Sequence, residues 1–170
     1  MLDNNFNELI SMIEKRRMNA YLKINEEEIM LNFEVGEFID KLVKNANCGD
    51  KIVDSIVNYM KTNYPNMNGY DRRSLYRKVD FYNAYKDNNK ALELAIKLSW
   101  SNNILILGNT KTDEERLFYL ALSVKEKYTK RELDRQIDSN YYGRYISSPD
   151  LALPSLISTI LSKYQNTRYL

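Results

Sequence analysis

The sequence predicts an all-α fold, a compact multi-helix domain with a helix-turn-helix-like segment. The chain of 170 residues contains only 5 Gly and 3 Pro, so few residues interrupt helices. Apolar residues recur at three- and four-residue spacing through most of the chain, and helix-capping residues precede several of these periodic segments. With 44% hydrophobic residues, the chain is long enough for one core. We expect one helical domain over residues 1–146 and a helical tail over residues 147–170.

The first predicted helix starts near Phe6 and continues to about Val43, as one long helix or two nearly collinear ones. Turn-prone residues 45–50 interrupt the pattern. Asp50 is positioned to cap a second helix, which ends near Tyr64 because Pro65 follows it. These two segments account for roughly the first third of the chain.

A turn over residues 66–71 separates the second predicted helix from the third. Asp71 is expected to cap the third helix, which continues to about Tyr85. The order of helix, short turn and basic helix is the helix-turn-helix-like segment. A further helix is expected over residues 90–100, and we also assign the short apolar run 102–107 to a helix rather than a strand.

The remaining helices follow hydroxyl caps. Threonine and acidic residues over 110–115 precede an apolar helix, and Thr129 is expected to cap the next one, over 130 to about 141. The final segment, 151–164, is apolar enough to pack on its own core or on a second subunit. We expect self-association through residues 151–161, with a homodimer as the simplest closure.

Composition excludes several functional classes. Net charge is only +2, so any attraction to nucleic acid must come from a local surface. Cys48 is the single cysteine and histidine is absent, which excludes an intramolecular disulfide and a structural zinc site, and no cofactor is expected. The N-terminus lacks a signal-peptide pattern and no run of 18 apolar residues occurs. We expect a cytoplasmic protein without a membrane span.

Positive charge concentrates in two segments that each begin a helix. The first is DRRSLYRK, residues 71–78, with Leu75 and Val79 expected to face the core. In helix-turn-helix proteins, such a helix contacts DNA phosphates and base edges. The candidate nucleic-acid contacts here are Arg72, Arg73, Tyr76, Arg77 and Lys78. The alternative is the solvated face of an ordinary helix.

The second basic segment is YTKRELDR, residues 128–135. Its candidate phosphate contacts are Lys130, Arg131 and Arg135, although Glu132 and Asp134 dilute the charge. Trp100, the single tryptophan, follows a run that looks buried, so we expect a mostly buried core anchor rather than a platform for a base.

No catalytic centre is evident in the sequence. The PD-(D/E)xK nuclease arrangement needs an Asp followed by Glu-x-Lys on a neighbouring strand, and no such element follows Asp150. Phosphate-binding glycine loops, nucleophile elbows and metal-ligand clusters are also missing from the sequence. We therefore expect a binding protein and not an enzyme.

The order of several short motifs resembles the N-terminal helical domain of YhcG-type proteins. Over about residues 18–145 these motifs are NAYLKIN (19–25), NFEVGEFI (32–39), DRRSL (71–75) with FY (81–82), LSWS (98–101), ERLFY (115–119) and YTKRELDRQI (128–137). Two positions depart from the family pattern: Asn102 replaces a histidine and Tyr128 replaces a tryptophan.

The resemblance implies a helical domain that, in longer relatives, precedes a PD-(D/E)xK nuclease domain and binds nucleic acid. The nuclease half has no counterpart in these 170 residues, so the chain is either a fragment or a stand-alone version. A DNA-binding module is the first hypothesis. The alternative is a protein-interaction module: a dimerisation or adaptor domain for a separate nuclease, or a mobile-element-encoded inhibitor of a nuclease complex.

Overall fold

The structure, a computed structural model, describes residues 2–45, 49–147, 157–159 and 162. Helices and the turns between them make up this part of the chain, which confirms the all-α prediction. Among these residues, no helix combines the length and the apolar character needed to cross a membrane.

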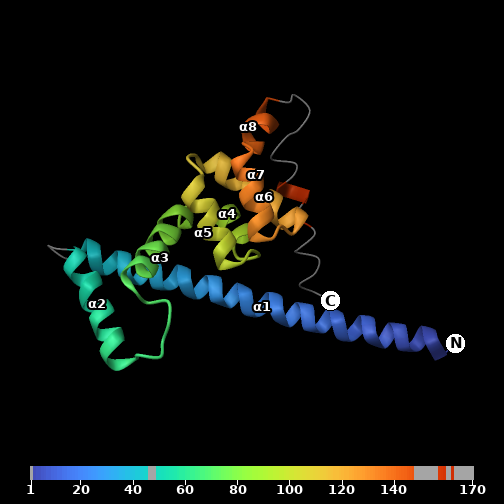
Figure 1. The fold of residues 1–170 in the computed structure, drawn as a ribbon, viewed down its shortest axis with the longest axis horizontal. Coiled ribbons are helices and arrows are strands. Elements are labelled where there is room, and N and C mark those ends of the chain that lie inside the picture. The colour runs from blue at the N-terminus through green and yellow to red at the C-terminus, as the bar shows by residue number, and fades with distance from the viewer. Residues whose placement is uncertain (1, 46–48, 148–156, 160–161, 163–170) are drawn as a thin grey trace.

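The first predicted segment is a single long helix, α1 (Leu2–Lys44), which decides between the two alternatives of one long helix and two nearly collinear ones. Its C-terminal half packs against α3 through the buried residues Ile29, Gly36 and Ile39. Its N-terminal part extends past the globular body formed by the later helices (Figure 1). Helix α1 is therefore both the base of the domain and a projecting arm.

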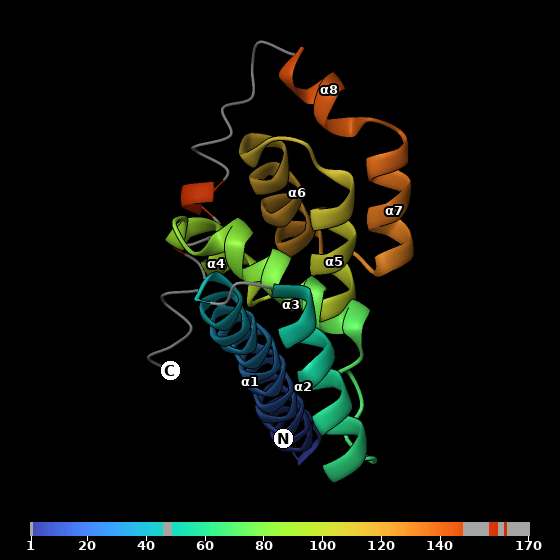
Figure 2. The ribbon, with the colours of Figure 1, turned by 90° about the vertical axis from the view of Figure 1, so that its left-hand side faces the viewer.

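Helices α2 (Gly49–Asn63) and α3 (Arg72–Tyr85) confirm the predicted helix, turn and basic helix. Helix α2 lies beside α1, with helices α4 to α8 above them (Figure 2). A small cluster of buried side chains joins α1, α2 and α3: Ile39, Val53, Val57 and Leu75. Helix α3 thus lies in the interior of the domain.

Gly36 allows α1 and α3 to approach closely. A Cβ built on Gly36 would lie 2.1 Å from the carbonyl oxygen of Lys78 and 2.9 Å from the Cβ of Tyr82. A backbone oxygen cannot swing aside as a flexible side chain can, so no residue with a Cβ fits at this crossing without separating the helices.

Helices α4 (Asn89–Ala95), α5 (Trp100–Asn109) and α6 (Asp113–Glu126) follow. The apolar run 102–107 is helical, as predicted. The helix expected over residues 90–100 was wrong at its C-terminal end, because it stops at Ala95. There the amide of Asn103 bonds the carbonyls of Ala95 and Ser99, and the hydroxyl of Ser99 accepts from the backbone N–H of Asn102 to cap α5.

Helices α7 (Lys130–Asp138) and α8 (Tyr141–Ile146) replace the single helix expected over residues 130–141. Asn140 interrupts it with a positive φ of 51°, and its side chain accepts a hydrogen bond from the N–H of Gly143 to start α8. Asparagine adopts this left-handed conformation more readily than most residues because its short amide bonds the local backbone.

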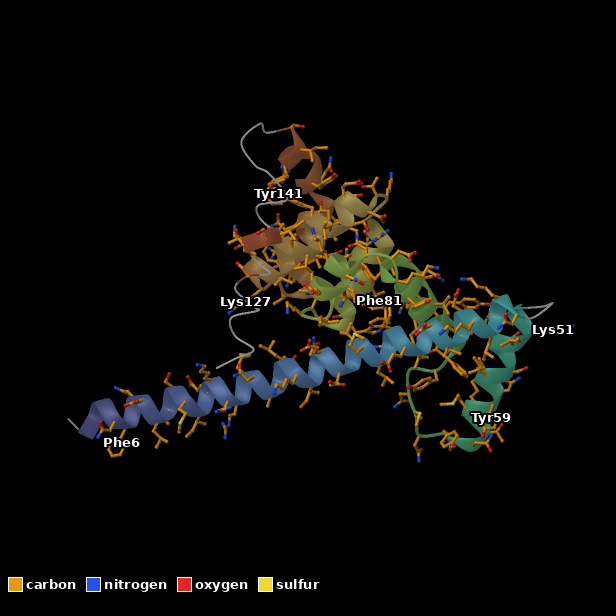
Figure 3. The ribbon with its side chains drawn as sticks, turned by 180° about the vertical axis from the view of Figure 1, so that it is seen from behind. Phe6, Lys51, Tyr59, Phe81, Lys127 and Tyr141 are labelled. Carbon is orange, nitrogen blue, oxygen red and sulfur yellow. The ribbon has the colours of Figure 1, made fainter. Side chains whose placement is uncertain are left out.

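The main core lies between α1 and the helices above it, where Phe81 is fully buried (Figure 3). The ring of Phe81 makes edge-to-face contacts with Phe33 of α1 and Trp100 of α5. Ile157 is buried against the same core. Most of the predicted apolar tail, including residues 151–156 and 160–161, lies outside the described residues, so its self-association stays a prediction.

Candidate nucleic-acid interface

Asp71 fixes the start of α3 and therefore the positions of its basic residues. Its carboxylate accepts hydrogen bonds from the backbone N–H and the hydroxyl of Ser74, at 3.1 and 2.5 Å. These bonds from Ser74, the hydroxyl bond first, lower the pKa of the Asp71 carboxyl. The predicted cap is confirmed, and it places Arg72 and Arg73 in the first helical turn.

Arg72 joins α3 to α2 rather than pointing only into solvent. Its guanidinium forms an ion pair with Asp54 and lies 5.5 Å from the centre of the Tyr76 ring. Tyr76 is itself half-buried against the small cluster shared by α1, α2 and α3. Both residues therefore have structural contacts that a nucleic acid would have to share.

Lys78 is buried, with 5% of its surface exposed, which corrects the expectation that it contacts nucleic acid. Its ammonium donates a hydrogen bond of 2.6 Å to the carbonyl of Gly69 and lies 5.0 Å from the Tyr70 ring. Burial lowers the pKa of this ammonium, and the charges of Asp71 and Glu28 oppose the shift. The spacing explains the error, since residue 78 lies three positions after the buried Leu75 and shares its face.

A groove of about 770 Å³ opens between α3, α5 and α7. Helix α5 forms its floor, α3 contributes one side and the start of α7 contributes the other. The residues lining it are Arg77, Asp80, Trp100, Ser101, Ile104, Leu105, Leu107, Gly108, Asn109 and Lys130. Arg77 of the first predicted basic segment and Lys130 of the second both line this groove.

Arg77 and Lys130 are the two cations that line the groove, although 53 positions of sequence separate them. Arg73 is exposed one turn before Arg77, on the same side of α3. Asp80 also lines the groove, so one carboxylate stands among the positive charges. The local balance is positive.

Trp100 lies at the first turn of α5 and is half-buried. One side of its ring system packs edge-to-face on Phe81, with 5.2 Å between ring centroids, and another part lines the groove. The prediction of a mostly buried anchor is confirmed, whereas the part of the indole that lines the groove was not predicted. An indole in this position can stack on a planar ligand.

A capping box positions Lys130. The backbone N–H of Thr129 donates to the Glu132 carboxylate at 2.8 Å, and the backbone N–H of Glu132 donates to the Thr129 hydroxyl at 3.4 Å. Leu133, fully buried, anchors the helix from the other side. Arg131 and Arg135 are exposed and do not line the groove, so only Lys130 of the second basic segment does.

Asn102 joins the floor of the groove, α5, to the start of the side formed by α7. It is buried on α5, and its amide donates a hydrogen bond of 2.9 Å to the carbonyl of Tyr128, two residues before α7. Asn102 and Tyr128 are the two positions that depart from the YhcG-type pattern. In this chain they contact each other and fix the start of α7 relative to α5.

The floor of the groove was not predicted from the sequence. For residues 102–107 the sequence predicted only a helix, in which Asn103 and Ile106 are buried. Ile104 and Leu107, spaced by three, form a second apolar face of α5 that lines the groove instead. The signal in the sequence that could have predicted this floor was a helix with apolar residues on two faces.

Metal binding finds no support in the side-chain arrangement. Within the described ranges, no group of three or more Cys, Asp or Glu side chains is placed to hold an ion. The groove itself contains a single carboxylate, from Asp80.

Comparison with known proteins identifies the family. No curated protein and no solved structure matches the chain. The family model described as the DUF1016 N-terminal domain matches residues 8–144, which is more than half of the chain and includes every residue that lines the groove. This match agrees with the resemblance to the N-terminal domain of YhcG-type proteins. The chain belongs to the DUF1016 N-terminal domain family.

Proposed function

We propose that this domain is a cytoplasmic, non-catalytic module that binds nucleic acid in the groove between α3, α5 and α7. One observation carries the proposal: the groove brings together Arg77, Lys130 and the half-buried Trp100 from three separate helices. Arginine and lysine neutralise phosphates, and an aromatic ring stacks on bases of any sequence.

The geometry favours an unpaired strand over a duplex read by a recognition helix. Helix α3 buries Leu75, Phe81 and Tyr85 between α1 and the upper helices, and its remaining face at Arg77 and Asp80 forms one side of the groove. A helix-turn-helix protein instead presents its second helix to the major groove. A cationic groove with an aromatic side chain is the usual design for single strands, where each stacked base contributes about 1–3 kcal/mol.

A second candidate is a protein-interaction module, and the floor of the groove supports it. Ile104, Leu105 and Leu107 provide an apolar surface, and Asp80 adds a negative charge beside Arg77. An apolar floor with a charged margin suits a peptide or helix from a partner, such as a nuclease for which this domain serves as adaptor or inhibitor.

Fluorescence anisotropy with labelled single-stranded, duplex and branched DNA, each at two salt concentrations, tests the first function. The Arg77→Ala/Lys130→Ala variant should bind single strands more weakly than the parent, and its log–log salt slope should be shallower by about 1.4, or about 0.7 for each lost phosphate contact. Both are side chains at a surface groove, so stability should change by about 0.5 kcal/mol or less for each.

The matched control is Arg131→Ala/Arg135→Ala, which removes the same charge from exposed positions outside the groove. This control should bind as the parent does. Equal losses in both variants would mean that net charge and not the groove drives binding. Absence of binding to every DNA form at low salt would refute the nucleic-acid proposal and favour the protein-interaction candidate.

A further inference from the structure

The projecting arm of α1 carries a row of exposed apolar side chains. From residue 5 to residue 24 every residue except Asn19 is exposed. Figure 3 shows Phe6 near the end of this arm, far from the globular body. The row continues beneath the globular body as far as Phe38. Its large apolar members, with exposed fractions, are Phe6 59%, Ile10 52%, Ile13 36%, Ile24 69%, Leu31 50% and Phe38 63%.

These residues follow a seven-residue repeat. Ile10, Ile24, Leu31 and Phe38 share one heptad position, together with Arg17, whereas Phe6, Ile13 and Ala20 share the position four residues earlier. Of the ten positions that the two series occupy from residue 6 to residue 38, six carry large apolar side chains, one is Ala20, and three are charged: Arg17, Glu27 and Glu34. Below the globular body it lies on a different face from Ile29, Gly36 and Ile39, which pack on α3.

The exposed arm of α1 needs a packing partner to be a stable helix. Helices in proteins obtain most of their stability from packing of an apolar face, and isolated helices are marginal in water. An exposed apolar row of this length on a surface indicates an interaction site. The row therefore needs a partner that is itself a long helix with apolar residues at the same spacing.

A second copy of α1 running in the opposite direction meets this need. In an antiparallel pair of identical helices, the residue numbers of two facing residues always add up to the same sum, which defines the register. A sum of 44 places Phe6 against Phe38, Ile13 against Leu31, and Ala20 against Ile24. Each arm then covers the part of the row that lies beneath the partner's globular body. Such a contact is self-complementary and closes as a dimer.

The charges within the row select the antiparallel arrangement. At a sum of 44, Arg17 faces Glu27 at two symmetric places in the dimer, and both side chains are exposed in the single chain. Ile10 faces Glu34, the one layer that is not matched. A parallel pair in register would instead place Arg17 against Arg17 and Glu27 against Glu27. Charges at and beside the seam determine the orientation of coiled coils.

We propose that α1 forms an antiparallel homodimer along residues 6–38, with Arg17 of each chain paired with Glu27 of the other. A shift by one heptad is less favourable, because a sum of 37 places Arg17 against Ala20, and a sum of 51 places Phe6 against Asn45, just beyond the end of α1. The overlap of 33 residues corresponds to about 50 Å of helix at 1.5 Å per residue. The dimer leaves the groove of each chain separate from the interface.

The test uses the full chain under reducing conditions, so that Cys48 cannot cross-link copies. Sedimentation velocity over a concentration series measures the dimer dissociation constant of the parent, Arg17→Glu, Glu27→Arg and the double variant. Each single reversal turns two attractive pairs into two repulsive ones, so we expect about a tenfold or greater increase in the dissociation constant. The double variant restores opposite charges and should recover the dissociation constant of the parent.

Two outcomes would overturn the proposal. A parent that stays monomeric at every concentration would mean that another surface, such as the chain's own C-terminal residues or a different protein, covers the row. A dimer insensitive to both single reversals would exclude the Arg17–Glu27 pairing, since a parallel pair predicts no change. An Ile24→Ser variant keeps the test independent of charge: Ile24 is exposed, so the fold should persist while dimerisation weakens.

Discussion

Replacing Gly36 by alanine should separate α1 from α3 at the place where these two helices cross. The added Cβ would lie 2.1 Å from the carbonyl oxygen and 2.7 Å from the carbonyl carbon of Lys78. Both atoms belong to the backbone of α3, so only a shift of the whole helix, by about 1 Å, restores a normal contact. That shift loosens the packing of Ile29 and Ile39 of α1.

The expected cost follows from two opposing effects. Overpacking a well-filled contact typically costs about 1–3 kcal/mol and sometimes more, and here backbone rather than a side chain must move. Alanine recovers about 1 kcal/mol of helix propensity relative to glycine. We expect the Gly36→Ala variant to lose about 2 kcal/mol of unfolding free energy, equivalent to a fall in Tm of about 4–8 °C for a chain of this size.

Gly108→Ala is the matched control, because the same change at Gly108 of α5 meets no atom within 4 Å. Near the end of a helix, it should stabilise the protein by about 0.5 kcal/mol. Urea denaturation followed by circular dichroism measures both variants against the parent. If Gly36→Ala were as stable as the parent or as Gly108→Ala, the close crossing of α1 and α3 would be refuted.

Three further predictions concern the supports of the groove. Lys78→Ala should destabilise the protein by about 2 kcal/mol in urea denaturation, since the bond to the Gly69 carbonyl is lost, while leaving the salt slope of DNA binding unchanged; a shallower slope would mean that Lys78 contacts phosphate. Thr129→Ala should cost about 1 kcal/mol in the same assay by removing the cap of α7, and a neutral result would contradict the capping box. Backbone and hydroxyl hydrogen bonds from Thr129 lower the pKa of Glu132 below its ordinary value of 4.5. The ionised carboxylate therefore stabilises the folded state above pH 4.5, and this stabilisation is lost as the pH falls through the lowered pKa. Urea midpoints of Glu132→Gln should therefore fall less between pH 7 and about pH 3 than those of the parent.

Local signals were sufficient to predict most helices. Apolar spacing predicted helix over most of α1, as one long helix or two nearly collinear ones, and caps at Asp71 and Thr129 predicted the starts of α3 and α7. The errors were at helix ends. Asn140 adopts a left-handed conformation that splits α7 from α8. Helix α4 ends at Ala95, whose carbonyl accepts hydrogen bonds from the Asn103 amide and from the backbone N–H of Leu98. Such helix ends depend on hydrogen bonds from individual side chains, which the periodic spacing of apolar residues does not predict.

The candidate site was predictable only in part. Two basic segments were recognised from the sequence. Whether they lie close together depends on how α3 and α7 pack on α5, which the spacing of apolar residues along each helix does not predict. Lys78 looked like its neighbour Arg77, yet a rotation of 100° between successive residues separates a buried side chain from one that lines the groove. Trp100 was predicted as a core anchor from the buried-looking run before it, and it does pack on Phe81, but nothing in the local sequence indicated that part of it lines the groove.

The single tryptophan makes the groove directly observable. Trp100 lines it and is the only tryptophan in the chain, so its emission, excited where tyrosine does not absorb, reports on that site alone. Titration with a single-stranded oligonucleotide should quench this emission with the same midpoint that anisotropy gives, and the Arg77→Ala/Lys130→Ala variant should shift both midpoints together to higher concentration. If the oligonucleotide bound by anisotropy while the Trp100 emission stayed unchanged, binding would occur elsewhere and the groove would not be the nucleic-acid site.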